Sequence, residues 1–307
     1  MFNVMKNFPK IVILPLLIIL AGIVTFIVGG GFKTDIDFAG GTIMQLNMEQ
    51  DFDIGEVKTV IKDTTGKDAD SVQKASNAAA AHQVIIKMQT LSADERTSLY
   101  TAIKEKFNLQ NSYEDSIITS ENITPLVSSE IIYNALLAVA IASILILLYV
   151  TIRFTFASGI AAIVALINDV LIMLSLYSIC RIPVNASFIA AILTIIGYSI
   201  NSTIVVFDRI RENKKFAKQG TFADVCEKSI WQTMRRTLNT TGTTVVTLII
   251  LAIMGEDSIR AFAIPLIVGV LSGAYTSSFI AAPIWNMIEG GDLKRKPGNV
   301  KTKKKPA

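Results

Sequence analysis

Six long apolar blocks divide this sequence, and they constrain its fold more than any other feature. Each is about 20 residues long, the length at which a helix rising about 1.5 Å per residue crosses a hydrocarbon core of roughly 30 Å. Hydrophobic residues make up 51% of the chain, and the mean hydropathy is +0.50. We therefore predict an α-helical polytopic membrane protein with six transmembrane helices. The blocks are Ile11–Gly30, Ile131–Val150, Phe156–Ile179, Ser187–Phe207, Leu238–Met254 and Phe262–Met287.

The first block has the features of a retained signal anchor. It follows Lys6 and Lys10, is longer than the apolar region of a cleaved signal peptide, and lacks a small-x-small cleavage site. We expect residues 1–31 to comprise a cytoplasmic amino terminus and the first membrane helix.

Residues 32–128 contain no segment long and apolar enough to cross a membrane, and their short-period hydrophobicity is typical of a folded, water-exposed domain. The predicted order is βαββαβ, which fits a ferredoxin-like α+β sandwich. Before the first strand, Gly40 and Gly41 predict a tight turn, because no helix follows them to make a phosphate-binding loop. The predicted strands are Thr42–Asn47, Ser71–Gln73, Val84–Met88 and Ser116–Thr119, and the helices are Phe52–Thr64 and Ser92–Phe107.

The charge distribution orients the chain. A cytoplasmic amino terminus places Arg153, a loop at 208–236 and a basic tail at 289–307 on the same side. The domain after the first helix, with 15 Asp and Glu against 9 Lys and Arg between residues 31 and 128, then lies outside. We expect a multi-pass protein with both termini in the cytoplasm and a bundle of five helices at 129–288.

Several classes of chemistry lack the residues they need. Cys180 and Cys226 have no CxxC spacing, and His82 is the only histidine, which argues against a disulfide framework, a metal site or a Ser-His-Asp triad. No Walker motif is present. We expect no enzymatic activity and no cofactor, so energy for any work must come from a membrane gradient or a partner.

Asp169 lies deep in the third apolar block. A carboxylate at that depth costs at least about 2.5 kcal/mol on insertion scales, so it should face the bundle interior and be paired or protonated. It is either a hydrogen-bonded lock between helices or a residue that takes part in ion or proton movement.

Polar residues form one stripe on each of the next two helices. In the fourth block Ser199, Ser202 and Thr203 follow i, i+3, i+4 spacing beside Gly197 and Asn201. The fifth block has Arg235, Arg236, Thr237, Thr240, Thr244 and Thr247. Hydrogen bonds between packed helices explain both stripes in the simplest way. Arg236 either snorkels to the cytoplasmic surface or reaches a polar core as a permanent countercharge.

The predicted loop at 208–236 opens with both signs of charge, Asp208, Arg209, Arg211 and Glu212 among them, in the pattern of a solvated elbow. It continues with moderate amphipathicity, which predicts a segment lying on the membrane surface. Its apolar anchors are Phe222, Val225, Ile230 and Trp231.

Four stretches together are highly specific: Asp35–Thr42 (DIDFAGGT), Gly197–Asn201 (GYSIN), Val205–Asn213 (VVFDRIREN) and Arg236–Thr244 (RTLNTTGTT). They resemble the SecF family of protein-export membrane proteins, part of the SecD and SecF accessory complex of the Sec translocon. The resemblance implies half of an RND-type transporter in a bacterial or archaeal cytoplasmic membrane. It also implies proton- or sodium-driven export of unfolded secretory proteins. The implied partners are SecD as a heterodimer, the SecYEG translocon, SecA indirectly and the lipid bilayer, and no nucleic acid.

Two positions depart from the family pattern. The family's GYS-Asn motif is typically followed by an Asp thought to carry the coupling ion with the Arg of the Arg-Thr-Leu motif, which here is Arg236. Here the Asp position is Ser202, whose hydroxyl does not ionise near neutral pH. The family often has His before the third-block Asp, and here that residue is Asn168.

Three explanations follow from the resemblance. A SecD carboxylate carries the ion while Arg236 tunes it, Asp169 substitutes for the missing acid, or sodium binds oxygen ligands such as Asn201, Ser202 and threonine hydroxyls. We favour the first. In each, repacking of the bundle would reach the outer domain through the first helix and a hinge at Gly29–Gly31. The polar stripes must then face each other or SecD and not lipid, so Ser202, Thr240 and Arg236 pointing outward into acyl chains would remove the basis for a gradient-driven role.

Two rival functions remain. One is an RND-type exporter of small molecules or lipids, although such proteins usually have much larger outer domains. The other is a structural subunit that stabilises SecD without conducting ions, which the serine at 202 favours.

Overall fold

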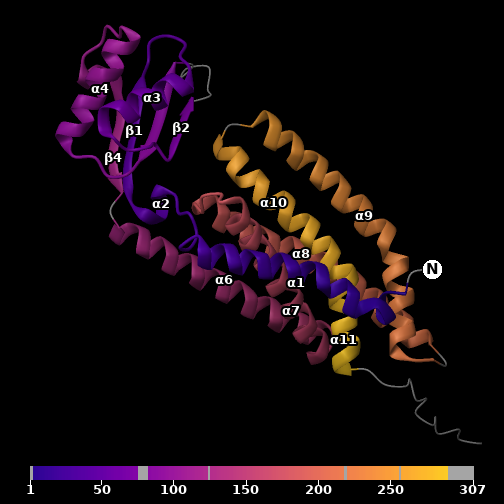
Figure 1. Cartoon of the computed structure of the whole chain (residues 1–307). Helices are drawn as coiled ribbons and strands as arrows, with labels where there is room; N and C mark the ends of the chain where they lie inside the picture. The colour runs from indigo at the N-terminus through magenta and orange to yellow at the C-terminus, as the bar shows by residue number, and fades with distance from the viewer. Residues whose placement is uncertain (1–2, 75–81, 124, 218–219, 256, 290–307) are drawn as a thin grey trace, which may run out of the picture.

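Six helices long and apolar enough to cross a membrane make up most of the protein, as predicted. The computed structural model describes residues 3–74, 82–123, 125–217, 220–255 and 257–289, and the predicted basic tail lies almost entirely outside these ranges. Figure 1 shows the helices side by side with a small sheet domain at one end. They are α1 (Val4–Val28), α6 (Pro125–Arg153), α7 (Phe156–Cys180), α8 (Ala186–Phe216), α9 (Phe222–Met254) and α10 (Asp257–Thr276), the last continuing through the π-helix η1 (Ser277–Ala281) into α11 (Ala282–Glu289).

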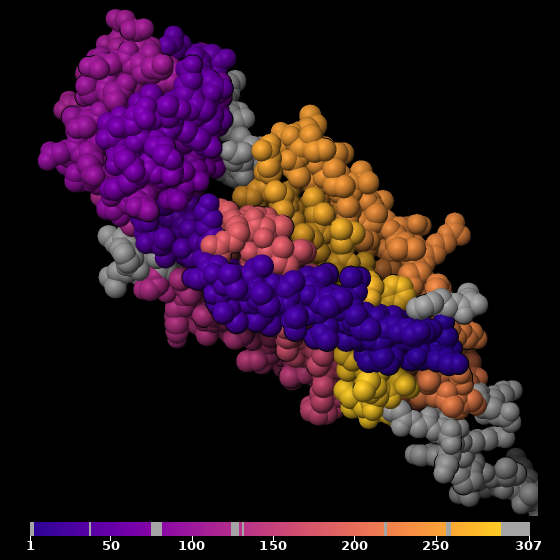
Figure 2. Space-filling view, in the orientation of Figure 1, coloured from indigo at the N-terminus to yellow at the C-terminus, as the bar shows by residue number. Residues whose placement is uncertain are grey.

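The centre of the bundle is formed by α7 and by the span from α10 to α11. In the most apolar stretch of each membrane span, the share of residues that are buried is 50% for α7 and 61% for the span from α10 to α11. The same share is 17% for α1 and for α9. Figure 2 accordingly shows α1 lying across an open face of the bundle. A polar residue on α7 therefore faces protein, whereas one on α9 often faces outward.

The sheet domain, residues 32–123, contains the predicted βαββαβ order plus two four-residue helices, α2 (Ile36–Ala39) and α5 (Tyr113–Ser116). Its four strands pair in the order β2-β3-β1-β4, all antiparallel. Met44, Val84 and Ile86 of the sheet pack with Ile61 of α3 and Ile103 of α4 in one core. The other bounds are β1 (Gly41–Asn47), α3 (Ile54–Thr65), β2 (Ser71–Lys74), β3 (Gln83–Met88), α4 (Ala93–Phe107) and β4 (Ile117–Ile123).

Local sequence explains where these elements begin. Asp53 caps α3 by accepting the backbone N–H groups of Gly55 and Glu56, and Ser92 forms a capping box with Glu95 at the start of α4. Gly40 ends α2 with φ of +76°, and a Cβ on Gly41 would lie 2.5 Å from the carbonyl oxygen of Met88. The turn therefore needs glycine at 40 for its backbone angle and at 41 for space.

The segment at 208–236, predicted as a loop, is largely helical, because α8 runs to Phe216 and α9 starts at Phe222. Hydropathy falls at Asp208, but i, i+3 pairs sustain the helix, with Arg211 donating to Asp208 at 3.0 Å and Arg209 to Glu212 at 2.5 Å. The charged residues from Asp208 onward end the apolar part of α8, but the helix itself continues to Phe216.

The prediction that Phe222, Val225 and Ile230 anchor this segment on the membrane surface is wrong, since all three are buried in the helical core. The Phe222 ring packs edge-on against Trp285, with centroids 5.4 Å apart. Trp231 is half-buried. The amphipathic face covers the protein interior instead of lipid.

Several contacts besides the chain itself attach the sheet domain to the bundle, among them the packing of α2 against α6. Thr34 forms a parallel bridge with Val184 in the α7–α8 connection, and the N–H of Asp35 donates to the Val184 carbonyl at 2.9 Å. The Arg181 guanidinium donates to the carbonyl oxygens of Gly29 and Gly31, at 2.9 and 3.0 Å. The predicted hinge at Gly29–Gly31, directly after α1, is therefore held by the side chain of Arg181, the residue that follows α7.

Candidate functional site

Asp169 lies in the middle of α7 with 1% of its surface exposed. Three hydroxyl groups donate hydrogen bonds to its carboxylate: Ser199 of α8 to Oδ2 at 2.5 Å, and Ser272 and Thr276 of α10 to Oδ1 at 2.6 and 2.7 Å. Of the described residues, no Lys or Arg forms an ion pair with it. The site is thus a buried acid with three donors and no countercharge.

The neighbouring Asn168 extends this network. Its side-chain amide donates to the Thr276 hydroxyl at 3.0 Å, which leaves the hydroxyl proton free to point at Asp169. Adjacent residues of α7 therefore contact the same threonine of α10: Asn168 donates to the Thr276 hydroxyl, and Asp169 accepts from it. Such a fully satisfied chain fixes the position of α10 relative to α7.

Two glycines of α10 bring the donors within reach. A Cβ on Gly269 would lie 2.4 Å from Ile195 of α8, and one on Gly273 would lie 3.0 Å from the Ser199 Cβ. Gly269 and Gly273 form the small-xxx-small pattern that lets membrane helices approach closely. The contact places Ser199 of α8 and Ser272 of α10 on opposite sides of Asp169.

Sequence reasoning missed Ser272 and Thr276, which supply two of the three donors. The sequence did contain a sign of this pair of donors: the two residues have i, i+4 spacing on an apolar helix, next to Gly269 and Gly273. The π-helix η1 begins at the next residue, Ser277, and π-turns inside α-helices often occur at functional sites.

Most of the other predicted site residues lie elsewhere. Ser202 is half-buried, while Gly197, Asn201, Arg236 and Thr240 are exposed. None of them donates one of the hydrogen bonds to Asp169 described above. The structure therefore separates a buried site on α7 from an exposed polar face on α8 and α9.

The threonine hydroxyls of α9 form their hydrogen bonds within their own helix. The hydroxyls of Thr240, Thr243, Thr244 and Thr247 each donate to the backbone carbonyl four residues earlier. The stripes of α8 and α9 touch where the Tyr198 hydroxyl donates to Thr244 at 3.2 Å. Arg236, Asn239 and Asn201 are exposed polar side chains of this face.

The charged motif at the end of α8 makes structural contacts. Arg211 donates to Asp208 and also to the carbonyl oxygen of Arg153 at 3.2 Å, while Arg209 donates to Gln232 of α9 at 2.7 Å. These bonds join α8 to α6 and to α9, so Asp208, Arg209 and Arg211 position helices.

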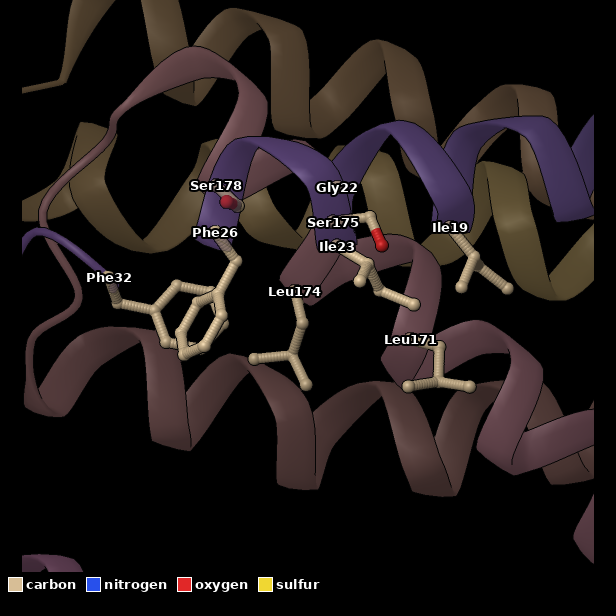
Figure 3. Close-up of a pocket in the computed structure, with 9 residues that line it drawn as sticks. All are labelled: Ile19, Gly22, Ile23, Phe26, Phe32, Leu171, Leu174, Ser175 and Ser178. Carbon is tan, nitrogen blue, oxygen red and sulfur yellow. The ribbon is translucent and has the colours of Figure 1, made fainter. Parts of the chain in front are cut away.

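A shallow groove of about 170 Å³ lies between α1 and α7. Figure 3 shows it lined by apolar side chains such as Ile23, Phe26 and Leu171, with Ser175 and Ser178 along its edge. Asp169 does not line it, so the groove and the carboxylate site are distinct features.

Chemically, the buried carboxylate of Asp169 is a group that can bind a proton or a small cation. Within the described ranges no group of three His, Cys, Asp or Glu side chains is placed to hold a metal ion.

Comparisons with known proteins identify the family. Residues 102–290, more than half of the 307, match the family described as "Protein export membrane protein SecD/SecF, C-terminal". The protein translocase subunit SecF of Sebaldella termitidis is 35% identical over 90% of this chain and 87% of its own length. The protein translocase subunit SecDF of Bacillus subtilis is 39% identical over 85% of this chain.

A crystal structure of SecDF, a translocon-associated membrane protein from Thermus thermophilus, superposes with a TM-score of 0.74 at 32% identity, covering 92% of this chain. This chain spans only 38% of that SecDF chain and 34% of the Bacillus protein. It thus matches about a third of a fused SecDF and most of a separate SecF. On these matches, the chain belongs to the SecF family of protein-export membrane proteins.

Proposed function

We propose that this chain pairs with a SecD subunit and uses the proton or sodium gradient to promote the passage of secreted proteins across the membrane. The observation that carries the proposal is Asp169, a carboxylate buried in the bundle with three hydroxyl donors and no countercharge. Ionisable residues at such depth mark ion or proton pathways by default. Relatives named as protein translocase subunits support export over the rival small-molecule transport.

Binding a proton or cation at Asp169 changes what its neighbours can do. A protonated carboxyl group keeps one oxygen as an acceptor and becomes a donor itself, so at least one of the three hydroxyls must reorient. Because Ser199 is on α8 and Thr276 on α10, the change acts between helices. One charge crossing 100 mV supplies about 2.3 kcal/mol, enough to bias two packings of a bundle.

The exposed polar face of α8 and α9 is the proposed SecD surface. Arg236, Asn239 and Asn201 are exposed beside apolar helix surface, where lipid offers them no partner. Outward orientation of Arg236 and Thr240 argues against coupling within this chain alone. It agrees instead with a SecD acid that meets Arg236, while Asp169 acts as a second, internal site.

The proposed setting is a complex with SecD beside the SecYEG translocon, with SecA reached indirectly and unfolded secretory chains as substrate. Both termini lie in the cytoplasm in this proposal, and the sheet domain lies outside. Arg153 at the end of α6, with Lys214 and Lys215 at the end of α8, supports that orientation.

The test compares Asp169→Asn and Arg236→Met in cells or vesicles that contain SecD, with export measured at imposed gradients. We expect each variant to lose most gradient-dependent export while its abundance stays normal. Matched controls are Asp63→Asn, on the exposed surface of α3, and Arg235→Met, which is exposed next to Arg236. Wild-type export in both test variants would reject the proposal and favour a structural subunit that stabilises SecD.

A further inference from the structure

A proline interrupts the backbone hydrogen bonding of α1. Pro15 lies inside this helix and has no N–H, so the carbonyl oxygen of Ile11, four residues earlier, loses its helical partner. The Tyr275 hydroxyl of α10 donates to that oxygen at 2.8 Å. A side chain from another helix thereby replaces the missing backbone donor.

Tyr275 is next to a residue that holds Asp169. Thr276 donates to the carboxylate, and successive residues of a helix point about 100° apart, so the two side chains face different neighbours. One turn of α10 thus contacts the Asp169 site through Thr276 and α1 through Tyr275. The ring of Tyr275 is also held by Phe279 of η1, with ring centroids 5.3 Å apart.

The rest of α1 is attached to other elements. At its start the Glu227 carboxylate of α9 accepts the N–H groups of Val4 and Met5, at 3.1 and 3.0 Å. Toward its end, Thr25 shares a hydrogen bond with Ser178 of α7 at 3.0 Å, along the seam that Figure 3 shows beside Gly22 and Ser175. Tyr275 therefore contacts α1 between these two attachments, at Pro15, one of the two prolines inside the helix.

We propose that Tyr275 is a positioning residue that transmits the state of Asp169 to α1 at Pro15. A shift of α10 caused by reorientation of Thr276 moves the Tyr275 hydroxyl, and α1 follows because the Ile11 carbonyl has no other helical donor. Helix α1 leads directly to Gly29–Gly31 and the sheet domain. This inference rests on the proposed gradient-driven function.

The experiment uses two substitutions and their combination in the full chain with its SecD partner. Tyr275→Phe keeps the ring and removes the donor, whereas Pro15→Ala restores a backbone N–H for the Ile11 carbonyl. Tyr149→Phe, which removes an exposed hydroxyl from α6, is the matched control. Melting temperature and gradient-dependent export are measured for each.

We expect Tyr275→Phe to lower gradient-dependent export by about three- to eighteen-fold, the factor that corresponds to about 0.6–1.7 kcal/mol for one membrane hydrogen bond. Adding Pro15→Ala should restore the melting temperature, because the Ile11 carbonyl is satisfied again, but not the export. Recovery of both in the double variant would show a structural role only and overturn the inference.

Wild-type export in Tyr275→Phe would also overturn it. The outcome of Asp169→Asn separates the two claims. If Asp169→Asn abolishes coupling while Tyr275→Phe does not, the inference fails and the proposed function stands. If Asp169→Asn and Arg236→Met both export normally, the proposed function itself fails. If only Asp169→Asn exports normally, the inference fails and the proposed function stands on Arg236.

Discussion

At the residue scale, carboxylates in this protein are held by donors in two different environments. Asp169 is enclosed by hydroxyl groups from α8 and α10. Glu49 lies on the water-exposed sheet domain and accepts the backbone N–H groups of Gln110 and Asn111, both at 2.9 Å. These two hydrogen bonds join the loop after β1 to the segment after α4. The backbone of Glu49 is left-handed, with φ of +55°.

Glu49 predicts a pH dependence of the sheet domain. Hydrogen bonds from the N–H groups of Gln110 and Asn111 lower the pKa of Glu49 below its usual 4.5. A group whose pKa is lower in the folded state stabilises it above the unfolded pKa, and this stabilisation is lost as pH falls through the folded pKa. We expect Glu49→Gln to weaken hydrogen-exchange protection around residues 108–112 at pH 7.

The same variant should differ little from wild type once the pH falls below the lowered pKa of Glu49, because the wild-type carboxyl group is then neutral, like the Gln amide. Glu105→Gln, at an exposed position of α4, serves as the control. A difference of equal size at neutral and acid pH would contradict the explanation.

At the scale of elements, the α8–α10 contact depends on the absence of side chains. A Cβ on Gly269 would lie 2.4 Å from Ile195, which leaves no room for it, and one on Gly273 would lie 3.0 Å from the Ser199 Cβ, a tight contact. The Asp169 site exists because this close approach places Ser272 and Thr276 beside α7.

We expect Gly269→Ala to destabilise the bundle by about 1–3 kcal/mol through overpacking, since the added Cβ would lie 2.4 Å from Ile195. Gly242→Ala on α9 is the matched control, because a Cβ there meets nothing within 4 Å. Helix propensity alone favours alanine at both positions by about 0.8–1.0 kcal/mol. Thermal unfolding in detergent measures the difference, and equal melting temperatures would refute the overpacking argument.

At the scale of the whole molecule, the sheet domain connects to the bundle through a small number of polar contacts. The Arg181 guanidinium holds the carbonyls at the end of α1, and Val184 pairs with Thr34. Both anchors belong to the end of α7 or the segment after it, and α7 also carries Asp169. A movement of α7 along its axis would reach the sheet domain directly.

We expect Arg181→Met to free the Gly29–Gly31 segment, with faster amide exchange at residues 29–35 and weaker gradient-dependent export, since both guanidinium hydrogen bonds to this segment are lost. Arg181→Lys should keep one donor and give an intermediate result. The neighbouring Cys180→Ser, at an exposed position, is the control. Unchanged exchange in Arg181→Met would show that the guanidinium does not hold this segment.

Much of the architecture was decided by hydrophobic pattern alone. Blocks of about 20 apolar residues can only be covered by lipid or by each other, so the six helices followed from their length. The order of strands and helices between residues 41 and 123 followed from caps and alternation, as at Asp53 and Ser92. The burial of Asp169 followed from the cost of exposing a carboxylate to lipid.

Only the tertiary structure decided which groups meet. Ser272 and Thr276 are ordinary polar residues of an apolar helix until Gly269 and Gly273 bring that helix against α8. Phe222 and Ile230 looked like membrane anchors because amphipathicity shows that a face is apolar and not what covers it. Pairing between distant helices depends on packing geometry, which is not written in the local pattern of any one segment, so the donors to Asp169 and to Ile11 emerged only in three dimensions.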